Sequence, residues 1–91
     1  YIGSDAKIVN SYVNQGSIVE GYVEHSVIFS DTLIDKGAKV IDSVIMPGAK
    51  IGEKGVINRC IVADGIEVAP GSILGSADSE NILLVAKDVE E

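Results

Sequence analysis

The chain has 91 residues, of which 46% are hydrophobic but 4% aromatic, and its formal net charge at pH 7 is −7. This length allows one domain, and an acidic chain repels the phosphates of nucleic acid. No apolar run approaches the ~20 residues of a transmembrane helix, and no charged-then-apolar leader is visible. The single cysteine excludes an internal disulfide, so we expect a reduced, cytoplasmic protein.

The first part of the chain carries large aliphatic residues at uneven steps of four to six residues. The shortest step runs from Val19 to Val23. Neither the 3.6-residue period of a helix nor sustained alternation fits this segment. The aliphatic positions are Ile2, Ile8, Val13, Val19 and Val23.

The middle of the chain consists of three consecutive 17-residue blocks, 26–42, 43–59 and 60–76, which align without gaps. A large aliphatic residue occupies the third, ninth and fifteenth places of each block, and the residue two places earlier is usually small. The aliphatic residues are Ile28, Ile34, Val40, Ile45, Ile51, Ile57, Val62, Val68 and Leu74. Repeats of this length indicate a solenoid.

Three steps per block predict three short strands and three corners, so each block is one coil of a triangular prism. Large aliphatic residues point inward, and small residues fill the space near each corner. The predicted fold is an all-β, single-stranded parallel β-helix of hexapeptide repeats with about four to five coils. The small columns are Ser11, Ser26, Ser43 and Cys60, and Ala38, Gly55 and Ser72.

Residues 17 apart should stack on one another in successive coils. This register places Lys36 over Glu53, Asp42 over Arg59 and Lys50 over Glu67, so that each pair is opposite in sign. Such lateral pairs contribute roughly 0.2–1 kcal/mol each.

The repeat ends near Ser76. We therefore divide the chain into a β-helix, residues 1–76, and a segment, 77–91, that holds a connector, a terminal strand and an acidic tail. The apolar stretch Ile82–Val85 is expected to cover the last coil, or to pack on a neighbouring domain or subunit, because an open strand edge favours aggregation. A chain beginning at Tyr1 is expected to be a piece of a longer protein.

Few residues are suited to catalysis, and the sequence predicts no catalytic, cofactor-binding or metal-binding residue in this chain. His25, the sole histidine, is a candidate general base, but the register favours a surface ladder of His25, Asp42 and Arg59. Cys60 replaces serine in an inward column and is interpreted as a buried filler. A zinc site would need more histidines or cysteines than the chain provides.

Five cations concentrate in the central coils, where an anionic effector could bind. The candidates singled out for allosteric binding are Arg59, Lys54 and Lys50. The competing interpretation is a solvated ladder, because three of the five have predicted acidic stacking partners. The glycines of GAKIGEKG (48–55) lack the spacing of a phosphate-binding loop and are assigned to corners. The five cations are Lys36, Lys39, Lys50, Lys54 and Arg59.

Three stretches of the chain are distinctive: NSYVNQGSIVEGYVEHSVIF (10–29), DSVIMPGAKIGEKGVINRCIV (42–62) and ILLVAK (82–87). Hexapeptide repeats are shared by many transferases, so the irregular features are more specific: the short step from Val19 to Val23, "EHSV", "DSVIMP" and the terminal "ILLV". Together these stretches resemble the C-terminal domain of bacterial glucose-1-phosphate adenylyltransferases, and the resemblance covers nearly the whole chain.

The resemblance implies a left-handed β-helix, which runs against the usual right-handed crossover. It also implies an N-terminal nucleotidyltransferase domain, absent from this chain, that uses ATP with Mg and glucose 1-phosphate to make ADP-glucose and pyrophosphate for glycogen synthesis. In the family, the C-terminal domain supports assembly into tetramers, either homo- or hetero-oligomeric, and helps to form an allosteric site for sugar phosphates.

Two details qualify the regulatory expectation. The connector SADSEN (76–81) lacks the arginines that hold fructose 1,6-bisphosphate in enteric members, whereas Arg59 matches the arginine that precedes their cysteine. The stretch "VIMPGAKIGE" resembles catalytic subunits more than non-catalytic ones.

Two other functions compete with this assignment. In a trimeric hexapeptide-repeat acyltransferase, His25 would be the general base, but such enzymes usually have a protruding loop that residues 26–76 lack. The chain could also belong to another sugar-1-phosphate nucleotidyltransferase or be an unrelated β-helix assembly domain. Partners are expected to be protein subunits, with no nucleic acid and no membrane. Candidate contact residues are Tyr12, Tyr22, Phe29 and Ile41.

Overall fold

A computed structural model describes residues 2–3, 6–75 and 82–86 of the chain. Every regular element in this part is a strand of two or three residues, and no described helix is long and apolar enough to cross a bilayer. The strands are β1 (Lys7–Val9), β2 (Tyr12–Val13), β3 (Ile18–Val19), β4 (Tyr22–Glu24), β5 (Val27–Ile28), β6 (Leu33–Ile34), β7 (Lys39–Ile41), β8 (Val44–Ile45), β9 (Lys50–Ile51), β10 (Val56–Asn58), β11 (Cys60–Val62), β12 (Glu67–Val68), β13 (Ile73–Leu74) and β14 (Leu83–Val85).

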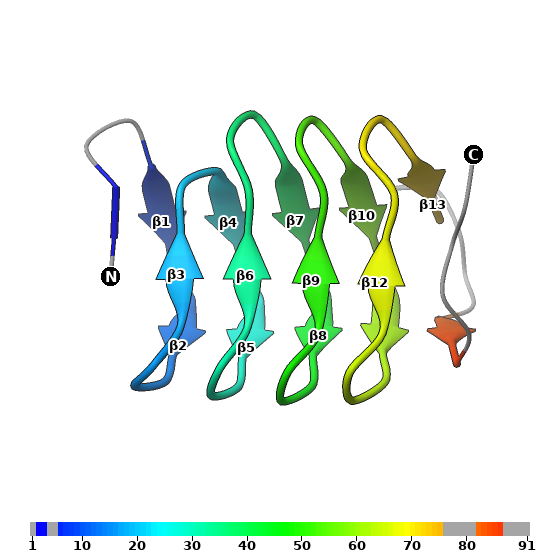
Figure 1. Cartoon of the computed structure of the whole chain (residues 1–91), viewed down its shortest axis with the longest axis horizontal. Helices are drawn as coiled ribbons and strands as arrows, with labels where there is room; N and C mark the ends of the chain where they lie inside the picture. Colours follow the sequence, from blue (N-terminus) through cyan, green and yellow to red (C-terminus); the bar gives the residue numbers. More distant parts are fainter. Residues whose placement is uncertain (1, 4–5, 76–81, 87–91) are drawn as a thin grey trace.

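The strands form three parallel sheets that run the length of a prism (Figure 1). We name them sheet A (β3-β6-β9-β12), sheet B (β1-β4-β7-β10-β13) and sheet C (β2-β5-β8-β11-β14). In Figure 1 the chain rises along sheet A, crosses behind at the top and descends while it advances from left to right, which is a left-handed path. The predicted left-handed parallel β-helix is therefore confirmed.

The core is a stack of aliphatic side chains, one from each strand. In sheet A, Ile34 pairs with Ile51 and Ile51 with Val68, which confirms the 17-residue register. Each of these side chains is at most 3% exposed. The same arrangement in sheets B and C buries Val23, Val40 and Ile57, and Ile28, Ile45, Val62 and Val85.

The serine column forms a hydrogen-bonded ladder beside this core. Ser26 Oγ donates to the carbonyl of Glu24 at 2.8 Å and accepts the N–H of Ser43 at 3.1 Å. Ser43 Oγ repeats the pattern, donating to the Ile41 carbonyl at 2.7 Å and accepting the Cys60 N–H at 3.1 Å. Each hydroxyl thus satisfies a buried backbone group in its own coil and another in the next coil.

The corners require backbone with positive φ. Glycine occupies many of these positions, but a column of non-glycine residues follows sheet B with φ of 46–52°. Asparagine and aspartate tolerate this conformation better than most residues, whereas a bulky side chain is uncommon there. The column is Asn10, His25, Asp42 and Arg59.

The corner between Val19 and Val23 is two residues shorter than those of later coils. Gly21 lies at its tip and is buried. A Cβ at Gly21 would collide with the Ala38 carbonyl oxygen and come within 2.8 Å of the Asp35 carbonyl oxygen. The short corner therefore depends on glycine because of close backbone approach.

The predicted charge stacks are only partly formed. Lys50 Nζ lies 3.8 Å from Glu67 Oε1, as expected on the flat surface of sheet A. Within residues 6–75, Lys36 and Glu53 form no ion pair, and neither do Asp42 and Arg59. These residues lie at or beside corners, outside the flat sheets that align neighbouring side chains. Their backbones therefore stack from coil to coil without bringing the charged side-chain groups into contact.

The terminal strand covers one third of the last coil. Cys60, Ile61 and Val62 of β11 pair with Leu83, Leu84 and Val85 of β14, which extends sheet C. The connector, residues 76–81, and the acidic tail, residues 87–91, lie outside the described residues.

We expect Ser43→Ala to destabilise the chain by about 1–3 kcal/mol, because it leaves the buried Cys60 N–H without its acceptor, whereas the Ile41 carbonyl still accepts the Arg59 N–H. Urea unfolding followed by circular dichroism measures the difference. Ser72→Ala is the control, since the Ser72 hydroxyl makes no hydrogen bond within the described residues. Equal stability losses for the two variants would contradict the ladder's role.

Candidate functional site

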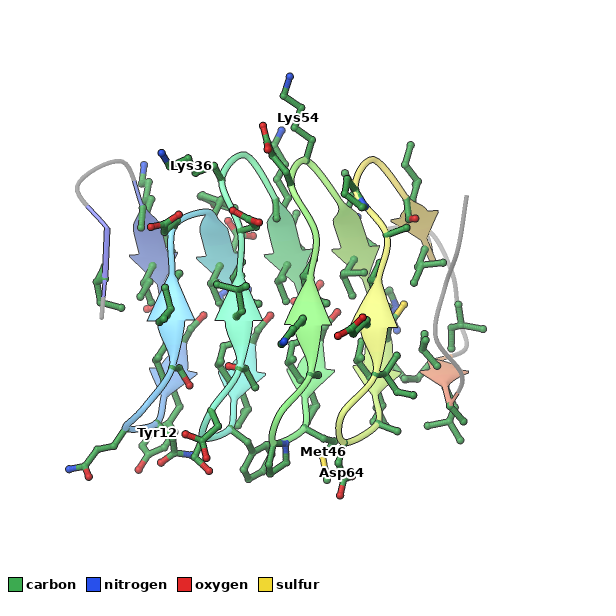
Figure 2. All side chains as sticks on the ribbon, in the orientation of Figure 1. Tyr12, Lys36, Met46, Lys54 and Asp64 are labelled. Atoms are coloured by element: carbon green, nitrogen blue, oxygen red, sulfur yellow. The ribbon has the colours of Figure 1, made fainter. Side chains whose placement is uncertain are left out.

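The three predicted allosteric cations do not converge on one pocket. Lys50 projects from sheet A, where Glu67 holds its ammonium group. Lys54 stands at the corner between sheets A and B, with a φ of 61°, and Figure 2 shows its side chain extending away from the prism. Arg59 lies at the next corner, between sheets B and C. A single ligand phosphate in this chain would not contact all three.

Arg59 has an unusual environment for a surface cation. Its side chain is half-buried, and its Nε atom is fully buried with no hydrogen-bond partner in the described part of the chain. The carboxylate of Asp42, its stacking neighbour, lies 3.6 Å from His25 Nδ1 instead. His25, Asp42 and Arg59 therefore stack in successive coils, as predicted. Within the described residues, His25 and Asp42 form an ion-pair contact, whereas Asp42 and Arg59 do not.

His25 contacts a neighbouring corner residue through each of its ring nitrogens. The Asn10 amide nitrogen donates to His25 Nε2 at 3.3 Å, and Nδ1 faces the Asp42 carboxylate. Both ring nitrogens therefore contact neighbouring corner residues, and His25 and Asp42 are exposed. General-base catalysis needs a nitrogen within reach of a substrate proton, and at His25 the Asn10 amide occupies Nε2.

Cys60 is the buried filler that the sequence predicted. It is 0% exposed, and its Sγ donates to the Asn58 carbonyl at 3.1 Å. Burial raises the pKa of the Cys60 thiol above its usual range, so the thiolate is disfavoured. In the described residues, no group of three or more histidine, cysteine or acidic side chains could hold a metal ion.

An apolar ladder lies on the outer surface of sheet C, and the sequence motifs did not predict it. Strand pairing aligns one outward residue from each strand, and none of the five carries charge. Tyr12 and Leu84, at the two ends, are 62% and 63% exposed, and the inner members are about one third exposed or less. The ladder consists of Tyr12, Val27, Val44, Ile61 and Leu84.

Sheet C differs in this respect from the other two sheets. Outward positions of sheet A include Lys50 and Glu67, and those of sheet B include Lys7, Glu24 and Lys39. The strands of sheet C contain no charged residue, although 23% of the chain is charged. An uncharged apolar strip of this length typically marks a surface that another protein surface covers.

Two of the four predicted contact residues lie on this side of the prism. Tyr12 belongs to the ladder, and Phe29 directly follows β5 and is half-buried. Tyr22 and Ile41 belong to sheet B. The sequence does contain the ladder's signal, because the second residue of every 17-residue block is aliphatic although the third is the one that points inward.

Comparisons with known proteins agree with the fold and with the predicted resemblance. Residues 2–84 match the family described as GlmU-like, C-terminal hexapeptide. The glucose-1-phosphate adenylyltransferase of Bacillus cytotoxicus is 41% identical over 90 residues, covering 98% of this chain and 24% of that protein. Those of Bacillus mycoides KBAB4 and Bacillus anthracis are 41% identical over 88 residues, covering 96% of this chain and 23% of each protein.

The chain thus spans about a quarter of the length of the curated relatives it matches. Among solved structures, the acetyltransferase domain of PglB from Neisseria gonorrhoeae FA1090 is similar, with a TM-score of 0.65 and 16% identity. The match covers 99% of this chain and 50% of that chain. At this identity the likeness shows the fold alone.

We expect the Cys60 thiol to react with an aromatic disulfide reagent at pH 8 at least about tenfold more slowly than a free cysteine, because the thiolate is the nucleophile and burial disfavours it. Absorbance of the released thiolate measures the rate. In 6 M guanidinium chloride the rate should rise to that of an unfolded peptide. Equal rates in the folded and unfolded chain would contradict the buried assignment.

Proposed function

Because this chain belongs to the GlmU-like C-terminal hexapeptide family, we propose that it is the C-terminal assembly and regulatory module of a glucose-1-phosphate adenylyltransferase. The observation that carries the proposal is 41% identity to such enzymes over 98% of the chain. The whole enzyme would make ADP-glucose and pyrophosphate from ATP and glucose 1-phosphate, with Mg, in the bacterial cytoplasm. That chemistry would reside in an N-terminal nucleotidyltransferase domain, for which the relatives have room because this chain covers about a quarter of their length.

The module acts mechanically in this proposal. The apolar ladder of sheet C docks against the nucleotidyltransferase domain of the same protein. That domain would make up the large part of the relatives' length that this chain does not span. Docking removes the exposed Tyr12, Ile61 and Leu84 side chains from water, at roughly 25 cal/mol per Å² of buried apolar surface. The remaining two faces are left for contacts with other subunits of a homo- or hetero-tetramer.

The regulatory part of the proposal concerns Lys54 and Arg59, because the third candidate, Lys50, already lies 3.8 Å from the Glu67 carboxylate. Since these two cations lie on different sides of the prism, each would contact a different anionic group. One such group could be the phosphate of a sugar-phosphate effector held between domains. The Arg59 guanidinium forms no ion pair within residues 6–75, so it could pair with an anionic group at such a boundary.

An acyltransferase with His25 as general base is not favoured. The 41%-identical relatives are named as adenylyltransferases, and the similarity to an acetyltransferase domain is confined to the fold. The contacts of both His25 nitrogens with Asn10 and Asp42 agree with this conclusion.

The division of labour is tested by measuring pyrophosphate release from ATP and glucose 1-phosphate. We expect activity in the full-length protein and none in the 91-residue chain. An inactive full-length protein that still assembles with a homologous active subunit would assign this chain to a non-catalytic partner subunit. Absence of both activity and assembly would overturn the proposal.

A matched pair of variants tests the docking surface. Ile61→Asp, on the ladder, and Ile18→Asp, on sheet A, change residues that are 36% and 42% exposed. In the full-length protein we expect Ile61→Asp to weaken docking at least about tenfold, or ~1.4 kcal/mol, because it buries a carboxylate. Limited proteolysis between the domains and pyrophosphate release report the loss. Equal effects of the two variants would rule out sheet C as the docking face.

A further inference from the structure

The short corner at Gly21 leaves a notch in the side of the prism. The coil below steps from Val19 to Val23, whereas the coil above steps from Ile34 to Val40 and so carries two additional corner residues, Lys36 and Gly37. These two residues project over a space of about 300 Å³. The notch is lined by Glu20, Gly21, Tyr22, Lys36, Gly37, Ala38 and Lys39.

The shortening also removes a hydrogen-bond acceptor. At the same corner of the next two coils, Lys54 N–H donates to the Lys36 carbonyl at 3.0 Å and Gly71 N–H to the Glu53 carbonyl at 2.9 Å. The equivalent group is the Gly37 N–H, which has no acceptor among the described residues because the coil below lacks the residue that would supply it. Gly37 is exposed and has a φ of 72°.

The Gly37 N–H lies in a lining that contains two lysines, Lys36 and Lys39. Lys36 and Lys39 are exposed, and neither forms an ion pair with a carboxylate in residues 6–75. Lys7 and Lys39 pair with Tyr22 from either side in sheet B. Lys54 stacks on Gly37 from the next coil, its Cγ lying 3.0 Å from where a Gly37 Cβ would stand.

Four acidic residues lie near these cations, and none forms an ion pair with them within residues 6–75. Asp35 Oδ1 accepts the Lys36 N–H at 2.8 Å, and Glu53 stacks over Lys36 in the next coil. Glu20 is the single carboxylate of the lining. Glu24 accepts a hydrogen bond from the Tyr22 hydroxyl, and this bond raises the Tyr22 pKa, so the phenol keeps its proton. Lys36 and Lys39 against Glu20 leave the lining with a formal charge of +1 (two minus one) in a chain of net charge −7.

We propose that this notch binds a small phosphate-bearing anion, with the Gly37 N–H as the central donor and the Lys36 and Lys39 ammonium groups on either side. A backbone N–H at a positive-φ turn, flanked by cations, is the arrangement that holds anions in many proteins. The site lies wholly within this chain and does not depend on the proposed function, so its test needs no adenylyltransferase activity.

The test is a titration of the ¹⁵N-labelled 91-residue chain with inorganic phosphate at low salt, followed by amide chemical shifts. We expect a saturable shift centred on Gly37. Lys36→Ala and Lys39→Ala should each raise the dissociation constant about tenfold, because each removes a charge-assisted contact. Lys50→Ala removes the same charge from sheet A, where Glu67 lies 3.8 Å away, and should leave the constant unchanged.

A second variant keeps every lysine and fills the notch. Inserting Asn-Gly between Glu20 and Gly21 restores the six-residue step, and the inserted asparagine carbonyl becomes the acceptor for the Gly37 N–H. We expect phosphate binding to be lost while circular dichroism and thermal unfolding show an intact fold. The proposal is overturned if this variant binds phosphate like the parent, if Lys50→Ala weakens binding as much as Lys39→Ala, or if the Gly37 amide does not respond.

Discussion

The structure depends on the limited room inside a triangular coil. Each side of the triangle is a strand of two or three residues, so the interior accepts one large side chain per side and a small one near each corner. Successive coils lie at the strand spacing of about 4.8 Å, so the same restriction applies at the same place in every coil. A 17-residue repeat of aliphatic and small residues is the result. The serine ladder follows from it, because a small residue with a hydroxyl can fill the corner and satisfy the backbone of two coils.

The outer surface has no such restriction, and there the three sheets diverge. Sheet C lacks charged residues and exposes the apolar ladder, whereas the outward positions of sheets A and B include both apolar and charged residues. A regular interior with varied exteriors suits a rigid spacer that presents a different surface on each side. The one break in the repeat, at Gly21, is the place where a cavity and an unpaired N–H arise together.

The sequence predicted the interior well and the exterior poorly, for the same physical reason. Ile34, Ile51 and Val68 could be assigned to one column because steric exclusion repeats every 17 residues. By contrast, exposed ion pairs are worth about as much as thermal energy, so stacking did not ensure that Asp42 would contact Arg59 rather than His25. The ladder was missed because outward valines such as Val27 and Val44 look like core residues until the strand register is known. The notch could not be predicted from the sequence, because it arises where the corner at Lys36 extends beyond the shorter corner of the preceding coil.

The central claim is that sheet C docks on the rest of the protein, and thiol protection measures this most directly. Val44, on the ladder, and Leu33, on sheet A, are both half-buried outward residues. Cys60 is buried in this chain, and labelling is measured at the introduced cysteine by peptide mass spectrometry. With Val44→Cys we predict rapid maleimide labelling in the 91-residue chain and strong protection in the full-length protein, while Leu33→Cys is labelled in both. Equal labelling of Val44→Cys in the two proteins would contradict the account.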